Sequence, residues 1–273
     1  MMSPEDAMNS LFRFRDESLF CHRSLDERPD PEAFPVHAHE TPELYLFQSG
    51  RGEYLVEGSH YPLQPGDLLL MRPAETHKLL ISPDDPYLRL AVHFPTDLFS
   101  SLDPEGQLMR AFFARPLGQR NHYPAAQYPG LSDPLVSLSP APGAERLPIV
   151  SRLFSVLTEI AGLFAAENEE TGPEGPASEL VSYVNTHLFE ELSLPQIARH
   201  FSLSSSQLGR LFREATGTSL WDYVSTKRLL SARAMLQRGD SAQSACLASS
   251  FSDYSAFYRA YKKRFGCSPS EER

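Results

Sequence analysis

The sequence contains few cysteines and no long uninterrupted apolar run. Its 273 residues include three cysteines, Cys21, Cys246 and Cys267, and no two of them have a CxxC spacing. This usage argues against a disulfide framework and a cysteine-ligated zinc site, and it favours a reduced, cytoplasmic protein. No apolar stretch approaches the roughly 18 residues that span a bilayer, so we expect no membrane partner. The first residues are too rich in charged side chains to resemble a signal peptide.

Charge is unevenly distributed along the chain. In total, 25 Lys plus Arg stand against 35 Asp plus Glu, which gives a formal net charge of −10. Residues 178–273 hold 12 of the basic and 9 of the acidic side chains, leaving 13 basic and 26 acidic ones in 1–177. The first part is therefore acidic, and the last part is mildly basic. Because DNA binding depends on the local field at phosphate contacts, this distribution favours a C-terminal DNA-binding module.

The N-terminal part has the pattern of short β-strands. Stretches rich in leucine, β-branched and aromatic residues alternate with turn signals such as SGRGE and QPGD. The expected strands cover 44–47, 53–58, 67–71, 77–81 and 87–94. Strands at such regular spacing predict an all-β sandwich or barrel.

Histidines and one glutamate form a constellation within this β segment. His37 and His39 precede Glu43, Gly50 follows, and His77 comes after a Pro-Gly-Asp turn. Residues two apart on an extended strand share a face, so the first two histidines can converge. Three imidazoles and a carboxylate suit zinc, iron, nickel or manganese.

The spacing resembles the two motifs of the cupin family, HxHxxxE followed by glycine and then GDLLLMRPAETH. This resemblance implies a barrel that binds a divalent metal, or a metal-free pocket for a small-molecule effector. The residues concerned are His37, His39, Glu43 and His77 for the metal, and the same four with Tyr45 for the effector. A third interpretation makes them ordinary hydrogen-bonding residues of the barrel. Ile81 departs from the enzymatic pattern, in which asparagine is usual, and strand alternation points Arg89 and His93 to the interior as plain core or edge residues.

The segment 146–177 connects the two parts. Residues 147–167 place apolar side chains on one face at three- and four-residue spacing, which predicts an amphipathic helix. That face can pack on the barrel or form a dimer interface, and both can hold. NEETGPEGPA at 168–177 has the polar, Gly/Pro-rich composition of a linker.

From residue 178 onward the pattern is helical. Ser193 and Ser204 each begin a capping box, with Gln196 and Gln207 three residues later. The helix after Ser204 ends at Gly217, the residue type that favours a helix C-terminus. Two short helices joined by a tight turn predict a helix-turn-helix unit.

The unit is repeated 49 residues later. LFREATGTS at 211–219 aligns with AYKKRFGCS at 260–268, and each copy has an apolar stripe, a basic outer face and a glycine stop. The helix expected between the copies has about 19 residues, or roughly 28 Å. Two recognition helices held about 34 Å apart enter successive major grooves on one face of DNA.

Residues 178–273 resemble the DNA-binding domain of the AraC/XylS family of transcriptional regulators. The resemblance rests on SSSQLGRLFREATGTS, on Arg228-Leu229 with Ala232 and Leu236, and on FSDYSAFYRAYKKRFGCSP. The expected fold is therefore multidomain. An all-β cupin-like barrel over 1–145 precedes an all-α domain over 178–273 with two helix-turn-helix units joined by a long helix.

The family pattern implies which side chains contact DNA. The expected set is Ser205, Ser206, Gln207, Gly209, Arg210, Arg213, Asp253, Tyr254, Ser255, Tyr258, Arg259, Lys262 and Lys263. Arg210 and Arg259 suit bidentate contacts to guanine. Arg213, Lys262 and Lys263 suit phosphates, whereas Arg228 either meets phosphate or braces the linking helix. Because the first unit has glycine at 209, we expect the second recognition helix to set much of the specificity.

These features predict a sequence-specific transcriptional regulator, expected to be an activator, that is controlled by a small molecule in the cupin-like domain. The resemblance favours a carbohydrate as that effector. Expected partners are double-stranded DNA, the effector, RNA polymerase and a second copy of the chain as a homodimer. We expect no catalytic residue, and a divalent metal in the cupin-like domain is the one cofactor considered. The alternative is a metal-dependent cupin enzyme fused to a DNA-binding domain.

Overall fold

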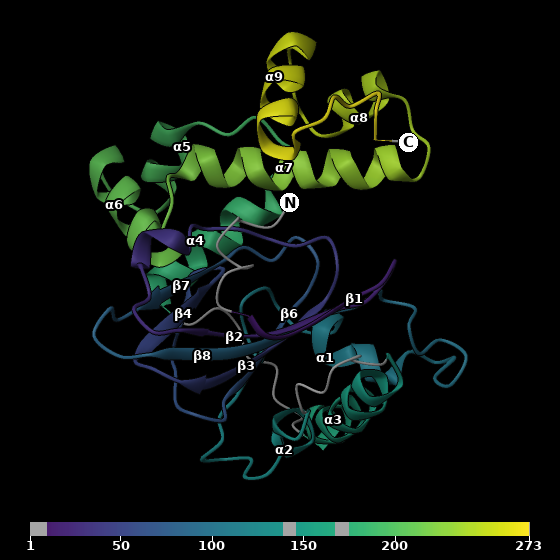
Figure 1. The fold of residues 1–273 in the computed structure, drawn as a ribbon. Helices are drawn as coiled ribbons and strands as arrows, with labels where there is room; N and C mark the ends of the chain where they lie inside the picture. The colour runs from purple at the N-terminus through teal and green to yellow at the C-terminus, as the bar shows by residue number, and fades with distance from the viewer. Residues whose placement is uncertain (1–9, 139–145, 167–174, 273) are drawn as a thin grey trace. The chain divides into compact units, whose positions relative to one another are not determined.

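A computed structural model describes residues 10–138, 146–166 and 175–272 (Figure 1). The chain divides into two compact units, and the division falls immediately before Gly175. The second unit thus begins slightly earlier than the predicted boundary at 178. Most of the linker predicted at 168–177 lies outside the described residues.

The first unit contains two antiparallel β-sheets. One has six strands in the order β1-β2-β8-β3-β6-β9, and the other has three in the order β5-β4-β7. The strands are β1 (Ser10–Arg15), β2 (Phe20–Asp26), β3 (Glu43–Ser49), β4 (Gly52–Val56), β5 (Ser59–Pro62), β6 (Leu68–Met71), β7 (His77–Ile81), β8 (Tyr87–His93) and β9 (His122–Tyr123). A short 3-10 helix, η2 (Pro31–Ala33), precedes β3. This confirms the predicted all-β domain, to which the structure adds β1, β2, β5 and β9.

Strand β3 lies between two layers of core. Because successive side chains of a strand point to opposite faces, Leu44 and Leu46 lie on one face and Tyr45 and Phe47 on the other. The leucines belong to a core shared with α3 (Arg146–Ala166), and the aromatic residues belong to a core between the two sheets. Glu43, the last residue of the HxHxxxE motif, therefore lies at the start of a strand that is buried on both faces.

Helices cover the outer face of the six-stranded sheet. They are η3 (Gln107–Met109), α1 (Arg110–Phe113), α2 (Asp133–Val136) and α3. The apolar face predicted over 147–167 is buried there, with Ile149, Leu153, Val156, Leu157, Ile160 and Phe164 in the core. The interpretation that this face packs on the barrel is confirmed.

The outward face of α3 bears on two other expectations. It presents small or polar side chains such as Ser151, Ser155 and Thr158, so an α3-mediated homodimer could not use the apolar stripe. By length and composition α3 also passes as a membrane span, with a mean hydropathy of 1.6 over its best window, a third of which is buried. The apolar side of α3 packs on the sheet, as described above.

The second unit consists of helices arranged along α7. They are α4 (Gly175–Thr186), α5 (Leu194–His200), α6 (Ser205–Thr216), α7 (Leu220–Gln237), α8 (Ala242–Ala248) and α9 (Tyr254–Phe265). In Figure 1, α5 and α6 lie towards one end of α7, and α8 lies towards the other. With 18 residues, α7 is about 27 Å long at 1.5 Å per residue. The two predicted helix-turn-helix units are α5–α6 and α8–α9, and the predicted fold class is confirmed.

Candidate functional site

Helix α6 begins at the predicted capping box and presents a polar face to solvent. The Gln207 amide N–H donates to Ser204 Oγ (3.2 Å), and the Ser204 amide N–H donates to Gln207 Oε1 (2.9 Å). Leu208 and Phe212 anchor the opposite face in the core. The cap occupies the amide oxygen of Gln207, which leaves only the Nε2 group of this expected contact for DNA.

Among the expected DNA contacts of α6, Ser205, Ser206, Gln207, Arg210 and Arg213 are exposed and Gly209 is half-buried. Arg210 Nε lies 3.9 Å from Glu214 Oε1, one helical turn away. An exposed pair of this type contributes only about 0.3–0.5 kcal/mol. The guanidinium of Arg210 can therefore exchange this carboxylate for DNA at little cost.

Helix α9 repeats this arrangement. Phe257 and Tyr261 are buried against α7 and α8, while the expected contacts on the other face are exposed. Those exposed residues are Asp253, Tyr254, Ser255, Tyr258, Arg259, Lys262 and Lys263. Asp253 is the N-cap, since its carboxylate accepts from the amides of Ser255 (3.1 Å) and Ala256 (2.8 Å). Its first role is thus to start the helix.

Arg228 fixes the two helix-turn-helix units to the connecting helix. Its guanidinium donates to the carbonyls of Leu188 (2.8 Å), Glu190 (2.8 Å) and Ser250 (3.0 Å). These carbonyls lie between α4 and α5 and in the α8–α9 turn, so Arg228 ties α7 to both parts of the domain. Of the two roles considered for Arg228, the structure shows the brace.

The structure brings the predicted histidines and glutamate of the first unit together. His39 Nε2 lies 2.9 Å and His77 Nε2 3.5 Å from Glu43 Oε2. His37 pairs with His77 through two backbone hydrogen bonds of 3.0 and 2.9 Å. His93 joins them from β8, where it is the register partner of Glu43, with Nε2 3.9 Å from Glu43 Oε1. We call these five residues the histidine–glutamate cluster.

Two imidazoles of the cluster face each other through their acceptor atoms. Nδ1 of His37 donates to the Pro35 carbonyl (2.9 Å), and Nδ1 of His77 donates to the Glu75 carbonyl (2.8 Å). A carbonyl only accepts, so in each neutral ring the Nε2 atom carries the lone pair. These two Nε2 atoms lie 3.1 Å apart. A cation bound between the two atoms, either a proton or a metal ion, would relieve the repulsion of their lone pairs.

Burial makes a proton unfavourable as that cation. It lowers the pKa of His77 to about 3 and the pKa of His37 to about 4. It lowers the pKa of His93 to about 4 as well. Near neutral pH the His37, His77 and His93 rings are therefore uncharged, which is the form that binds metal ions.

The donor set fits a divalent transition metal. The ligand atoms of His37, His39 and His77 lie within 4.8 Å of one another, and so do those of His39, Glu43 and His93. Although His39 approaches it, the buried Glu43 Oε2 has no hydrogen-bond partner of acceptable geometry. An ion held between imidazoles and a carboxylate would be typical of zinc, iron, nickel or manganese.

Tyr45 follows Glu43 by two residues on β3. It is buried, and its hydroxyl is 2.7 Å from that of Tyr87. Burial raises its pKa well above the usual value, so the phenol stays protonated. Its predicted contact with an effector stays a prediction, and Ile81, at the departure from the enzymatic pattern, is a core residue.

Arg115 and Glu75 form a buried ion pair next to the cluster, which no sequence pattern predicted. Arg115 Nη1 and Nη2 each donate to one oxygen of Glu75 (both 2.7 Å), and both side chains are fully buried. Burial alone would raise the pKa of Glu75, but the guanidinium and backbone donors keep it below the usual value. Glu75 is also the residue whose carbonyl orients His77. The pair therefore supports the cluster from outside it.

A domain with two helix-turn-helix units on one connecting helix, preceded by a cupin-like β domain, defines a class of two-domain DNA-binding regulators. Residues 197–273 match a family model described as a helix-turn-helix domain, and residues 24–157 match the AraC-like ligand binding domain. The chain belongs to the AraC family of transcriptional regulators.

Curated relatives cover nearly the whole chain. The HTH-type transcriptional activator RhaS of Klebsiella pneumoniae (strain 342) is 25% identical over 260 residues, which cover 92% of this chain and 91% of the relative. RhaS of Salmonella schwarzengrund (strain CVM19633) is 24% identical over 263 residues, with the same coverage. These relatives point to a regulator rather than an enzyme.

Solved structures that match the chain include a DNA complex. The DNA-binding domain of AdpA with a target DNA has a TM-score of 0.34 and 25% identity, covering 36% of this chain and 89% of that one. ToxT from Vibrio cholerae has a TM-score of 0.41 and 12% identity, covering 93% of this chain and 97% of that one.

Proposed function

We propose that this regulator binds a specific double-stranded DNA sequence through α6 and α9, under the control of a small molecule held in the first unit. The observation that carries the proposal is the repeat of an exposed, arginine-bearing helix on one connecting helix. Each copy is anchored by buried aromatic residues and capped at its N-terminus. The exposed residues named above are the proposed contacts.

Titration of the chain with fragments of its own promoter region tests this proposal. At moderate salt, one fragment should bind at least tenfold more tightly than random DNA, as specific sites generally exceed non-specific ones by far more. Equal affinity for all fragments would contradict sequence-specific binding. A screen of carbohydrates and other metabolites by thermal shift identifies the effector, because a ligand of the native state raises its unfolding temperature.

We further propose that the regulator acts in the cytoplasm as a homodimer that contacts RNA polymerase. Dimers are the commonest oligomers, and a second copy would double the number of recognition helices. Because the apolar stripe of α3 is buried, the dimer would form through other, exposed residues. Sedimentation measurements with and without DNA test this association.

A second candidate function is favoured by the histidine–glutamate cluster. We propose that His37, His39, Glu43 and His77 hold a divalent transition metal, with His93 available as a further ligand. The metal would supply a coordination site for an effector or, in the alternative of a cupin enzyme, a Lewis acid. The lone pairs that face each other at 3.1 Å support a bound cation.

Purified protein is expected to contain about one equivalent of a divalent transition metal per chain, measured by mass spectrometry of the metals. Glu43→Gln should weaken the metal by about 10-fold or more, because it removes the one anionic ligand of the cluster. His93→Gln should weaken metal binding less, since His93 Nε2 lies 3.9 Å from the nearest Glu43 oxygen, against 2.9 Å for His39 and 3.5 Å for His77. His60→Gln is the matched control, because His60 is an exposed histidine away from the cluster. Absence of metal after growth with zinc, iron, nickel or manganese would contradict the assignment.

A further inference from the structure

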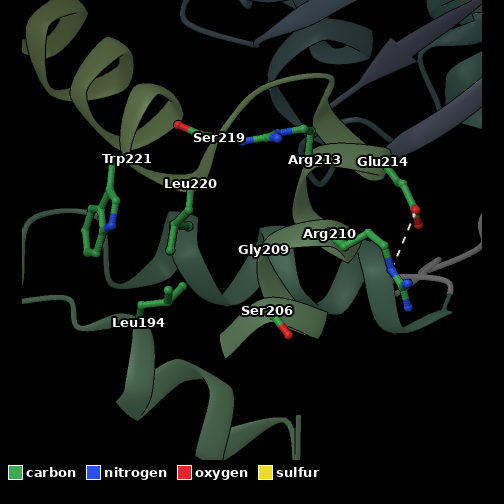
Figure 2. Close-up of a pocket in the computed structure, with 9 residues that line it drawn as sticks. All are labelled: Leu194, Ser206, Gly209, Arg210, Arg213, Glu214, Ser219, Leu220 and Trp221. Carbon is green, nitrogen blue, oxygen red and sulfur yellow. Dashed lines mark ion pairs between the residues drawn. The ribbon is translucent and has the colours of Figure 1, made fainter. Parts of the chain in front are cut away.

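An open hollow of about 500 Å³ lies beside the first recognition helix (Figure 2). It is formed where the start of α5, the outer face of α6 and the start of α7 meet. Its lining residues are Leu194, Ser206, Gly209, Arg210, Arg213, Glu214, Ser219, Leu220 and Trp221. The base-reading contacts proposed above involve only the α6 side of this hollow.

The lining has an apolar side and a charged side. Trp221, Leu220 and Leu194 lie together on one side in Figure 2, and Arg213 and Arg210 come from α6. Trp221, the one tryptophan in the chain, is 46% exposed as a residue. Among the described residues that line the hollow, Glu214 is the one acidic member, and its ion-pair partner is Arg210. The exposed Asp222 directly follows Trp221 in the sequence. Its carboxylate accepts a hydrogen bond from the Ser219 hydroxyl (2.6 Å).

Gly209 keeps the hollow open. It lies inside α6, where glycine is about 1 kcal/mol less favourable than alanine. A Cβ atom built at this position meets no atom within 4 Å, so nothing in the described structure requires glycine there. Glycine at this position lowers the stability of α6 but leaves the hollow free of a side chain. This suggests that another molecule occupies the hollow when the chain is bound to it.

We propose that this hollow receives a sugar–phosphate segment of the DNA strand that borders the major groove read by α6. Ser206 and Arg210 belong both to the hollow and to the expected base-reading face, so an occupant of the hollow belongs to the same DNA. The apolar face of a deoxyribose packs on Trp221 and Leu194, while the adjoining phosphate meets Arg213. This inference rests on the DNA-binding function of the chain, and it adds Trp221 and Leu194 as contacts that hold the helix in register without reading sequence.

The single tryptophan makes the proposal directly measurable. Duplex added to the intact protein should protect the indole from iodide quenching, and it should do so with specific and unrelated duplexes alike. Trp221→Ala should weaken binding to both duplexes by the same factor, about tenfold, because roughly half of the indole surface would lose its contact with DNA. Trp221→Phe should retain most of the affinity, because its ring still packs on the sugar. Arg213→Gln should reduce the slope of log K against log salt by about one.

Three outcomes would separate the possible failures. If a labelled duplex binds with an unchanged exposure of the indole to iodide, DNA binding stands and the hollow is not its backbone site. If Trp221→Ala keeps full DNA affinity but loses binding to RNA polymerase, the hollow is a protein-binding surface and the proposal is overturned. If the labelled duplex does not bind at all, the failure lies in DNA binding itself. Because Trp221 is exposed, its variants should keep the circular dichroism of the parent, which is the check on folding.

Substitutions at Gly209 give an independent prediction. Gly209→Ala should shift the urea midpoint for unfolding of the second unit to a higher concentration, because it removes a helix-interior glycine without a clash. Gly209→Leu should fill the hollow and weaken binding to both duplexes, as Trp221→Ala does. A Gly209→Leu variant that is folded and binds both duplexes with parental affinity would contradict the proposed occupant.

Discussion

Replacing Arg115 by alanine is expected to lower the free energy of unfolding of the first unit by about 3–5 kcal/mol, since it strands a buried carboxylate. Glu75 accepts both Arg115 hydrogen bonds and one each from the amides of Gly118 (2.8 Å) and Arg72 (3.0 Å). Arg115 also donates to the carbonyls of Leu70 and Ala111, so its loss leaves acceptors without a donor. Denaturant unfolding followed by circular dichroism measures the change.

Two controls separate the buried charge from a general effect of losing an arginine. Arg210→Ala removes an exposed member of an ion pair and should cost less than about 1 kcal/mol. In Arg115→Ala combined with Glu75→Gln, the stranded group is neutral, so part of the lost stability should return. A cost for Arg115→Ala as small as that for Arg210→Ala would contradict the structural role of the pair. Because the Glu75 carbonyl orients His77, metal affinity should fall in Arg115→Ala as well.

The features that could be predicted from the sequence are those that depend on residues close together in the chain. The capping residues Ser204 and Gln207 lie three apart, and the structure confirms their reciprocal hydrogen bonds. At Ser193, the structure shows the hydroxyl accepting from the Gln196 amide, the first half of the predicted box. Helical periodicity likewise revealed α3, and the alternation of short apolar runs revealed β3, β4, β6, β7 and β8. In each case the physical signal repeats within two to four residues.

The features that could not be predicted depend on partners far apart in the chain. His93 joins the cluster only because β8 pairs with β3 in a register that sets it opposite Glu43. Arg115 reaches Glu75 across 40 residues, and no local pattern marks either residue. Strand alternation did point His93 to the interior, but it gave no reason to choose it over an ordinary core residue. The metal and effector assignments, and the DNA contacts, stay predictions until they are measured.

The second recognition helix is expected to dominate sequence preference. Arg259→Ala should weaken binding to the specific site by about 1–3 kcal/mol, or roughly 5- to 150-fold, because a bidentate contact to guanine discriminates by that amount. It should also relax the preference at one base pair. Lys263→Ala should weaken specific and unrelated duplexes evenly and should lower the salt slope by about one. Affinities for a set of single-base variants of the site, at two salt concentrations, measure both effects.

Arg259 and Lys263 make a matched comparison because both residues are exposed and neither anchors the core. They lie four residues apart on α9, whose buried side chains are Phe257 and Tyr261, so either change should leave the fold intact. Both variants lose one positive charge, and the difference between them therefore isolates base reading from electrostatic attraction. Equal effects on specific and unrelated duplexes in the two variants would show that Arg259 acts on phosphate alone. Specificity would then have to come from other side chains of α9, such as Tyr254 and Tyr258, or from the shape of the DNA.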